Sequence, residues 1–562
     1  MADASMSIGL SGILAAQTAL TVSGENITNS TTPGYARRQV QLAENAPTGP
    51  EANTETGVNA DTIVRDRDMY LEGQLQNYNA GLSSATTLSQ YLNQIQSLLQ
   101  EPSSTSDGIS TQLDTFFNDW QAVAANPTDS ATRSALLNAA QQLAQSLQDL
   151  ENGLVSVQSS VDQNLSGAIT QVNQLTAELA QNNQLTSNAT SNGSAPLSLE
   201  DQRDSLMAQL AQLTGAVNTS PQQSTASVQV GGATLVSGST SLTLNAPASP
   251  GGSVTAGDGN QAGPVSITGG TIGALLQLSQ TTIPGYLQEL NSFTAGLISM
   301  VNEQHAEGIS ENGPSTSVTA TNSVSDANAM LAEAGLSATP TQGQLTINVV
   351  DNATGAQTPV TISVNPSSES LNDLATAINN AGGGNLTATV SDGDLSISAA
   401  GGYSFDFAAN QGTNILASLG INPFFQGTNA SNIQLADALV NNPAAIAAGQ
   451  SADSGDGSNA MAISNLENAA SAAFGGSSLA GYWQTVVSGI GSDAENATET
   501  QTSAQNMVDT VNTQEQAISG VSLDEEAANI LQYQQVYTDC AHYMATVGQL
   551  SQTLLSYISG VA

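Results

Sequence analysis

The chain contains no lysine, a single cysteine and little charge of either sign. Among its 562 residues the only strongly basic side chains are six arginines, against 47 Asp and Glu residues, so the formal net charge is −41. Nucleic acids and anionic membrane surfaces require clustered positive charge, which this chain cannot supply. Charged residues total only 9%. We therefore expect no nucleic-acid partner and a polar surface built mainly from Ser, Thr, Asn and Gln.

Two further absences concern the membrane and the route of export. No stretch approaches ~20 consecutive apolar residues, so we expect no membrane insertion. The first twenty residues lack a basic start followed by a cleavable apolar core, which argues against a cleaved signal peptide. One cysteine, Cys540, cannot form an internal disulfide. The protein either stays in the cytoplasm or leaves it by a route that cleaves no leader.

Residues capable of catalysis or metal binding are few and poorly placed. Cys540 and His542 lie two apart on a predicted helix and therefore point in different directions, so they cannot share a metal. The run Asp453–Gly457 resembles a calcium loop, but its spacing fails the required pattern and its composition indicates a flexible linker. We expect no enzyme activity, no catalytic residues, no metal and no cofactor.

What the sequence does contain is a seven-residue apolar repeat at both ends. Spacings of four and three connect Met6, Leu10, Ile13, Gln17, Leu20, Gly24 and Ile27, and likewise Leu523, Ala527, Ile530, Gln534, Tyr537, Ala541, Met544, Gly548, Ser551, Leu555 and Ile558. This repeat indicates helices that bury a seam against other helices, so the ends should pair with each other or with neighbouring copies. Polar and small residues dilute the seam, which predicts terminal helices that are disordered in the monomer and completed on polymerisation.

Between the ends, helical and strand patterns alternate. Heptad spacing after a capping segment at 126–130 and the absence of proline from 128 to 195 predict a helix of roughly 50 residues, or ~75 Å, in an intramolecular bundle. Residues 37–75 are predicted to be extended. Period-two patterns predict short strands at 221–267 and in a separate unit at 341–425, whose helix would begin with a Ser370–Asp373 capping box. Pro284 should kink or divide a helix at 273–304.

These patterns predict a mainly α fold with inserted β domains: discontinuous terminal coiled-coil helices, a long helical bundle and two β-rich outer inserts. The expected parts are 1–75, an N-terminal axial helix and extended segment; 76–220, a helical bundle; 221–268, a small β insert; 269–310, a helical return; 311–450, an outer β-rich insert; 451–520, a second helical return; and 521–562, a C-terminal axial helix.

Particular motifs lie at the two ends. The first helix is followed by a turn comprising Asn26, Asn29, Thr32, Pro33, Gly34 and Tyr35. The two Asn side chains share a helical face and can bond local backbone, Pro33 fixes φ, Gly34 gives the turn its freedom, and Tyr35 can anchor the returning chain. Near the other end, Ser522 and Glu525 stand at capping-box spacing ahead of Leu523 and the last helix.

In these motifs the chain resembles the axial proteins of the bacterial flagellum, and within that family the hook-associated members. The resemblance spans nearly the whole chain. It implies a structural, self-assembling junction adaptor between hook and filament, exported unfolded and uncleaved through the flagellar type III channel to the extracellular flagellum. It also implies four partners: about eleven copies of the chain in a ring, the hook protein, a second hook–filament junction protein and a dedicated cytoplasmic export chaperone.

The residues expected to carry assembly are Leu10, Ile13, Leu20, Asn26, Ile27, Asn29, Thr32, Pro33, Gly34 and Tyr35 at the N-terminus, and, for assembly and chaperone binding, Ser522, Leu523, Glu525, Ile530, Tyr537, Met544, Leu555 and Ile558 at the C-terminus. Two alternatives stay open at this point. The chain could be a hook or distal-rod protein, which would share the ends. Its β inserts could instead make it a surface adhesin, or a surface enzyme, carried on a flagellar scaffold.

Overall fold

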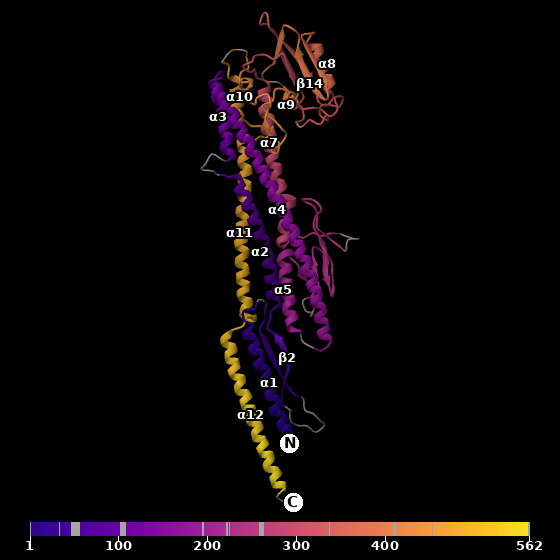
Figure 1. Cartoon of the computed structure of the whole chain (residues 1–562), viewed down its shortest axis with the longest axis vertical. Helices are drawn as coiled ribbons and strands as arrows, with labels where there is room; N and C mark the ends of the chain where they lie inside the picture. The colour runs from indigo at the N-terminus through magenta and orange to yellow at the C-terminus, as the bar shows by residue number, and fades with distance from the viewer. Residues whose placement is uncertain are drawn as a thin grey trace. The chain divides into compact units, whose positions relative to one another are not determined.

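Long helices dominate the chain, and small antiparallel sheets are inserted between them (Figure 1). Helices make up 57% of the structure and the long terminal helices pack together, which confirms the expected fold class. The structure is a computed structural model that describes residues 2–32, 34–45, 57–101, 108–193, 196–220, 223, 225–257, 263–336, 338–408, 412–451, 453 and 455–559. The chain divides into two compact units, formed by residues 1–90, 161–280 and 496–562 and by residues 91–160 and 281–495.

The helices follow one another along the chain with bounds that largely match the apolar periodicity. They are α1 (Ala2–Thr28), α2 (Met69–Leu99), α3 (Ile109–Ala125), α4 (Ser130–Ser191), α5 (Leu197–Thr214), α6 (Gly270–Gln277), the π-helical turn η1 (Leu278–Thr282), α7 (Ile283–Ala306), α8 (Leu371–Ala381), α9 (Ile415–Leu419), α10 (Ser458–Ser464), α11 (Leu479–Ser519) and α12 (Leu523–Ser559), with short 3₁₀ turns at η2 (Pro443–Ala445), η3 (Asn465–Glu467) and η4 (Ala472–Phe474).

The helix α4 shows how directly the heptad pattern translates into burial. It runs for 62 residues, longer than the predicted 50, and Asp129 accepts a hydrogen bond from the Ala131 backbone N–H at its start. Its apolar stripe is buried within a single copy of the chain: Leu136, Leu143, Leu147, Leu150, Leu154, Val157, Val161, Leu165, Val172, Leu175 and Leu179. This burial confirms the intramolecular packing expected of this helix.

The sheets of the first unit are small and antiparallel. The strands β1 (Arg38–Glu44) and β2 (Val58–Arg65) form a hairpin in which Arg38 is opposite Arg65, and the register shifts by one residue between Gln41 and Leu42. The predicted strands at 221–267 form two sheets, with orders β3-β4-β5-β6 and β7-β8-β9. Their bounds are β3 (Val217–Asn218), β4 (Val228–Val230), β5 (Ala233–Ser237), β6 (Thr240–Ser241), β7 (Leu244–Asn245), β8 (Thr255–Ala256) and β9 (Gly263–Pro264).

The second unit contains the larger β-rich insert. Its sheets have the orders β12-β11-β15, β10-β14-β13 and β16-β17, formed by β10 (Ser317–Thr319), β11 (Gly343–Asp351), β12 (Gln357–Val364), β13 (Leu386–Ser391), β14 (Asp394–Ala399), β15 (Tyr403–Phe407), β16 (Phe425–Gln426) and β17 (Gln434–Leu435). The predicted Ser370–Asp373 capping box is present at the start of α8, with both reciprocal hydrogen bonds formed. The strand β10 lies within the predicted insert 311–450 but outside the segment 341–425 in which strands were predicted. Three residues are too few to show a period-two pattern.

Three local features differ from or refine the sequence-based expectation. The segment 37–75 was expected to be extended throughout, but α2 already begins at Met69, where Asp68 accepts hydrogen bonds from the backbone N–H groups of Tyr70 and Leu71. Pro284 divides the predicted helix as expected, since it stands at the start of α7 directly after η1.

The segment Asp453–Gly457, predicted to be a flexible linker, is held in place at Asp456. This carboxylate accepts hydrogen bonds from the backbone N–H groups of Gln450, Ser451 and Ser458 and from the Ser451 hydroxyl. These bonds hold the pKa of Asp456 well below its usual range, although burial opposes the shift. Composition alone suggested mobility because it does not show which backbone groups a carboxylate will reach.

One described helix, at Ser5–Thr28 within α1, is long and apolar enough to cross a membrane, judged by length and composition only. This helix contains no long run of consecutive apolar residues, because Ser, Thr and Gln interrupt it. In this structure the helix packs along α12 instead (Figure 1).

Candidate functional site

The helices α1 and α12 form an antiparallel pair that brings the two ends of the chain together (Figure 1). An added Cβ at Gly12 would lie 2.6 Å from Cys540 Sγ, and one at Gly9 would lie 2.5 Å from Met544 Cγ. The partner numbers fall as the α1 numbers rise, as antiparallel helices require. The predicted pairing of the two ends is therefore confirmed.

The fully buried side chains of α1 are mostly small, and this helix packs against both α12 and the β1–β2 hairpin. The buried α1 residues include Ala15, Ala16, Ala19, Val22 and Ser23, whereas Leu10 and Leu14 are 49% and 54% exposed. Small residues let two helix backbones approach closely, as at Gly9 and Gly12. Ile13 and Leu20 are half-buried, so only some of the large side chains of α1 are exposed. The heptad reading could not separate these faces, because both follow the same period.

The predicted assembly residues fall into two groups by exposure. Those half-buried or buried are Ile13, Leu20, Asn26, Ile27, Asn29, Tyr35, Ile530 and Met544; those exposed are Leu10, Thr32, Gly34, Ser522, Leu523, Glu525, Tyr537, Leu555 and Ile558; Pro33 lies outside the described residues. Their role in assembly stays a prediction. Five large apolar members, Leu10, Leu523, Tyr537, Leu555 and Ile558, are exposed, as the side chains of an unfilled contact surface would be.

The turn after α1 is closed by Asn26, which is 1% exposed. Its amide donates to the Arg38 carbonyl at 2.9 Å, while its oxygen accepts from the Arg38 backbone N–H at 2.9 Å and from the Tyr35 hydroxyl at 2.8 Å. The expectation that Asn26 bonds local backbone is thus wrong, because its partner lies twelve residues on. Asn29 does bond locally, to the Glu25 carbonyl, and Gly34 has a φ of +78°.

Tyr35 anchors the returning chain as expected. Its hydroxyl meets Asn26, and the Arg38 guanidinium carbon lies 5.0 Å from its ring centroid. Burial raises the pKa of Tyr35 against the opposing effect of Arg38. The phenol therefore stays protonated and keeps donating to Asn26.

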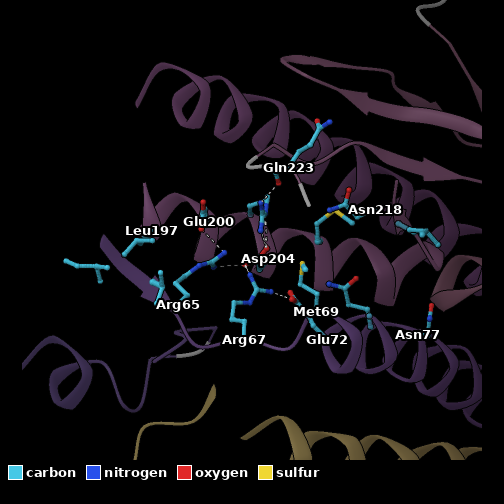
Figure 2. A pocket seen from close by; sticks show the side chains of 18 residues that line it. Arg65, Arg67, Met69, Glu72, Asn77, Leu197, Glu200, Asp204, Asn218 and Gln223 are labelled. Atoms are coloured by element: carbon cyan, nitrogen blue, oxygen red, sulfur yellow. Dashed lines mark hydrogen bonds and ion pairs between the residues drawn. The ribbon is translucent and has the colours of Figure 1, made fainter. Parts of the chain in front are cut away.

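Four of the six arginines gather beside the β1–β2 hairpin and the start of α5. Asp201 accepts from Arg38 at 3.0 Å and from Arg65 at 2.8 Å, which joins both strands at the base of the hairpin to one carboxylate. Figure 2 shows Arg65 and Arg67 pointing toward Glu200, Asp204 and Glu72. Arg203 completes the cluster through Asp204.

This cluster lines a pocket of about 660 Å³ between the hairpin side and α5 (Figure 2). The guanidinium groups in it are already held by carboxylates, and Arg203 also donates to the Gln223 carbonyl. Burial tends to lower the pKa of Arg65, but Asp204, Asp201 and Glu200 outweigh it and the pKa is raised. The arrangement is a brace that fixes the extended segment against α5, and its charges are largely neutralised internally.

The remaining N-terminal arginine, Arg37, reaches the start of α12. Its Nε donates to Glu526 at 2.9 Å and its Nη1 lies 3.1 Å from Glu525. The predicted Ser522–Glu525 capping box is formed in one direction, with the Glu525 backbone N–H donating to Ser522 Oγ at 3.4 Å. The Glu525 carboxylate contacts Arg37 instead of returning to the cap.

Sequence reasoning did not identify the arginines or the glycines Gly9 and Gly12 as structural determinants. A signal was available: in a chain without lysine, five of six arginines lie at 37, 38, 65, 67 and 203, close to the turn motif or to the Asp201–Asp204 run. Scarce charges grouped near carboxylates indicate ion pairs. The glycines carry no comparable signal, because a glycine in a helix looks the same whether or not a partner lies against it.

The comparisons with known proteins agree with this architecture. Residues 92–318 match the family described as the flagellar hook-associated protein FlgK helical domain. Flagellar hook-associated protein 1 of Escherichia coli is 26% identical over 574 residues, covering 97% of this chain and 98% of the relative. That of Salmonella typhimurium is 27% identical over 571 residues, with the same coverage.

A more distant sequence and a solved structure extend the comparison. Flagellar hook-associated protein 1 of Bacillus subtilis is 30% identical over 209 residues, or 35% of this chain and 40% of the relative. The flagellar hook junction protein FlgK from Burkholderia pseudomallei shares the fold, with a TM-score of 0.54 at 20% identity, covering 80% of this chain and 100% of that structure. Over nearly its whole length the chain is similar to flagellar hook-associated protein 1, and it is a structural, non-enzymatic component of the bacterial flagellum.

Proposed function

We propose that this chain joins the hook to the filament, and that its α1–α12 pair is the surface through which neighbouring copies contact one another. One observation carries the proposal. Among the described residues, 13 of the 25 exposed large apolar side chains lie on α1 and α12, although these helices comprise only 27 and 37 residues. Apolar side chains concentrated in this way mark a contact surface.

The exposed side chains are arranged along the helix axis. On α12, Val536, Tyr543, Leu550 and Tyr557 recur every seven residues, and Leu554 extends the same stripe. A seven-residue repeat is the pattern that a second helix buries. Tyr543 lies at the edge of the α1 contact, 3.1 Å from an added Cβ at Gly9. Val536, Leu550, Leu554 and Tyr557 are exposed and can pack against a neighbouring copy.

The expected partner proteins follow from the similarity to the hook-associated proteins and from this exposed apolar surface. We infer contacts with the hook protein and with a second hook–filament junction protein. Before export, the same apolar stripe of α12 would need cover in the cytoplasm, which supports a dedicated chaperone. Export without a cleaved leader, through the flagellar channel to the extracellular junction, belongs to the same proposal.

The first experiment deletes the gene in its source organism and combines electron microscopy of the cells with an assay for flagellin in the medium. Hooks without filaments, together with flagellin lost to the medium, are the expected result. Cells without hooks would contradict the junction role in favour of a hook or rod protein. Intact filaments would contradict it in favour of a surface function of the β inserts.

The second experiment returns the double variant L550S/L554S to the deletion strain. These side chains are 65% and 61% exposed in the single chain, so its unfolding free energy should change by no more than about 0.5 kcal/mol. Each leucine buried between copies contributes about 1.5–3 kcal/mol, so filament formation should be lost.

The matched control for this variant is V155S/L185S, which removes two exposed apolar side chains of α4 that are 50% and 47% exposed. The control should restore motility and filaments. If L550S/L554S also restores them at normal protein levels, the α12 stripe is not an assembly contact.

A further inference from the structure

Three segments of the first unit meet at Arg37: the turn after α1, the end of α11 and the beginning of α12. The Arg37 backbone N–H donates to the Ser519 carbonyl at 3.1 Å, at the last residue of α11. Its guanidinium contacts Glu525 and Glu526 in the first turn of α12. Arg37 therefore spans the break between the two helices from outside them.

The break itself is short and sharply defined. The Gly520 N–H donates to the Gln516 carbonyl, which closes the last turn of α11, and Ser522 caps α12. Only residues 520–522 separate the helices. With so short a connection, holding the first turn of α12 in place also fixes the direction in which α12 leaves the break.

Burial makes the ion pair of Arg37 with Glu526 more important for the position of α12 than its ion pair with Glu525. The Glu526 side chain is 2% exposed and that of Arg37 is 16% exposed, whereas Glu525 is 62% exposed. A buried carboxylate that loses its cation is costly, while an exposed one is rehydrated at little cost. Glu526 therefore constrains the position of α12, and Glu525 does so only weakly.

The α1–α12 contact gains from such a constraint. At the closest approach α1 presents Gly9 and Gly12, while Met544 and Tyr543 lie against Gly9 and Met6 lies near Gly548. Methionine is flexible and adapts to gaps of different shape, so these contacts fix the register only weakly. A contact outside the helix pair therefore contributes to the choice of register.

We propose that Arg37 is the positioning residue that sets the register of the α1–α12 pair, by holding the first turn of α12 against the turn that ends α1. In this register Gly12 faces Cys540 and Gly9 faces Met544. The proposal deepens the assembly function above, since the register decides which apolar side chains are presented to neighbouring copies.

The single cysteine makes the register measurable. An ideal Cβ at Gly12 lies 3.6 Å from Cys540 Cβ, within the range of about 3.5–4.5 Å that disulfides adopt. The variant G12C should therefore form a disulfide with Cys540 in the purified full-length monomer, seen as a mobility shift under non-reducing conditions. Cysteine one turn away on either side, in I8C or A16C, should cross-link poorly. Equal cross-linking of all three cysteine positions would instead support the disorder expected of the free terminal helices and would overturn the proposal.

The decisive comparison places R37Q in each of these three cysteine backgrounds. Loss of the Arg37–Glu526 ion pair should slow G12C cross-linking about tenfold or more. It should also increase the yield of cross-linked I8C or A16C. A general loss of stability would lower all three yields, so the rise of a neighbouring position distinguishes slipped register from simple unfolding. If G12C keeps its yield and the other two stay low in R37Q, Arg37 does not set the register.

Variants of Glu525 and Glu526, the ion-pair partners of Arg37, test which of the two contacts sets the register. E526Q should reproduce much of the R37Q pattern, whereas E525Q should resemble the unmodified chain because Glu525 is mostly exposed. R37K should restore the preference for G12C in part, since an ammonium keeps the charge but not the planar fork. Equal effects of E525Q and E526Q would contradict the argument from burial.

These measurements use the monomer and are independent of the assembly experiments. A chain in which R37Q leaves the register unchanged but L550S/L554S abolishes filaments would overturn the positioning role and leave the junction function intact. The reverse result would overturn the proposed contact surface while keeping the role of Arg37.

Discussion

His305 is fully buried at the end of α7, where its two ring nitrogens face different partners. Nε2 accepts from the Ala447 backbone N–H at 3.0 Å, so the proton of the neutral ring is on Nδ1, which donates to the Asn422 carbonyl at 2.9 Å. Burial lowers the pKa of His305 to about 4, the Asn422 carbonyl opposes the shift and Arg133 adds to it. A charged ring would lose the bond from Ala447.

We expect His305 to make the stability of the second unit pH-dependent. Its pKa falls from 6.5 in the unfolded chain to about 4 in the folded one, so its contribution is present above pH 6.5 and is lost as the pH falls toward 4. The loss is about 3 kcal/mol over that window. The measurement is the difference in unfolding free energy between the unmodified chain and H305Q as a function of pH, which should shrink toward low pH.

Glu467 changes the stability of the second unit with pH in the opposite direction to His305, and it therefore supplies a control. Burial and the neighbouring Asp114 carboxyl raise the pKa of Glu467 to about 7. Its stabilising contribution is therefore present at low pH and declines as the pH rises from 4.5 toward 7. E467Q should remove this opposing slope and make the His305 effect plainer; a pH-independent difference between H305Q and the unmodified chain would contradict the neutral-histidine assignment.

At the scale of elements, the glycines of α1 decide how closely α12 can approach. Helix propensity alone favours replacing a helical glycine by alanine, by about 1 kcal/mol. At Gly9 and Gly12 the new methyl group would lie 2.5 Å from Met544 Cγ and 2.6 Å from Cys540 Sγ, so the neighbour must move. Overpacking of this kind typically costs about 1–3 kcal/mol.

We therefore expect G9A/G12A to loosen the terminal pair, measured as faster amide hydrogen exchange in α12. The control is G24A on the same helix, where no atom lies within 4 Å of the added methyl group. G24A should leave exchange unchanged or slow it, in keeping with its helix propensity. Slower exchange in both variants would show that the helices are not in close contact at Gly9 and Gly12.

At the scale of the whole molecule, the net charge is −41, and few positive side chains are available at the surface to pair with the carboxylates of a neighbouring copy. Arg37, Arg38, Arg65, Arg67 and Arg203 all bind carboxylates of the same chain, and Arg133 donates to the carbonyls of Pro127, Pro443 and Ile446. The arginines are thus engaged within the chain. Copies that approach one another repel.

Self-association should therefore be accelerated by salt. Raising NaCl from about 0.01 M to about 1 M shortens the Debye length from about 30 Å to about 3 Å, which removes most of the repulsion and slightly strengthens apolar contacts. Light scattering of the purified chain measures the rate. The variant E495Q/E499Q/D509N, which removes exposed carboxylates of α11, should associate faster at low salt; salt-independent association would contradict the argument.

The sequence alone determined the helical character of the chain, the strands of the two inserts and the resemblance to the flagellar hook-associated proteins, and it left open whether the ends pair with each other or with neighbouring copies. Periodicity and turn chemistry act over a few residues, so α4, the Ser370–Asp373 box and the division at Pro284 could be predicted. Tertiary structure alone decided which face of α1 meets α12, the Asn26 bond to Arg38 and the Arg37 contact with Glu526. These depend on side chains that are far apart in the chain, and local pattern contains no information about which distant carboxylate or glycine will lie against them.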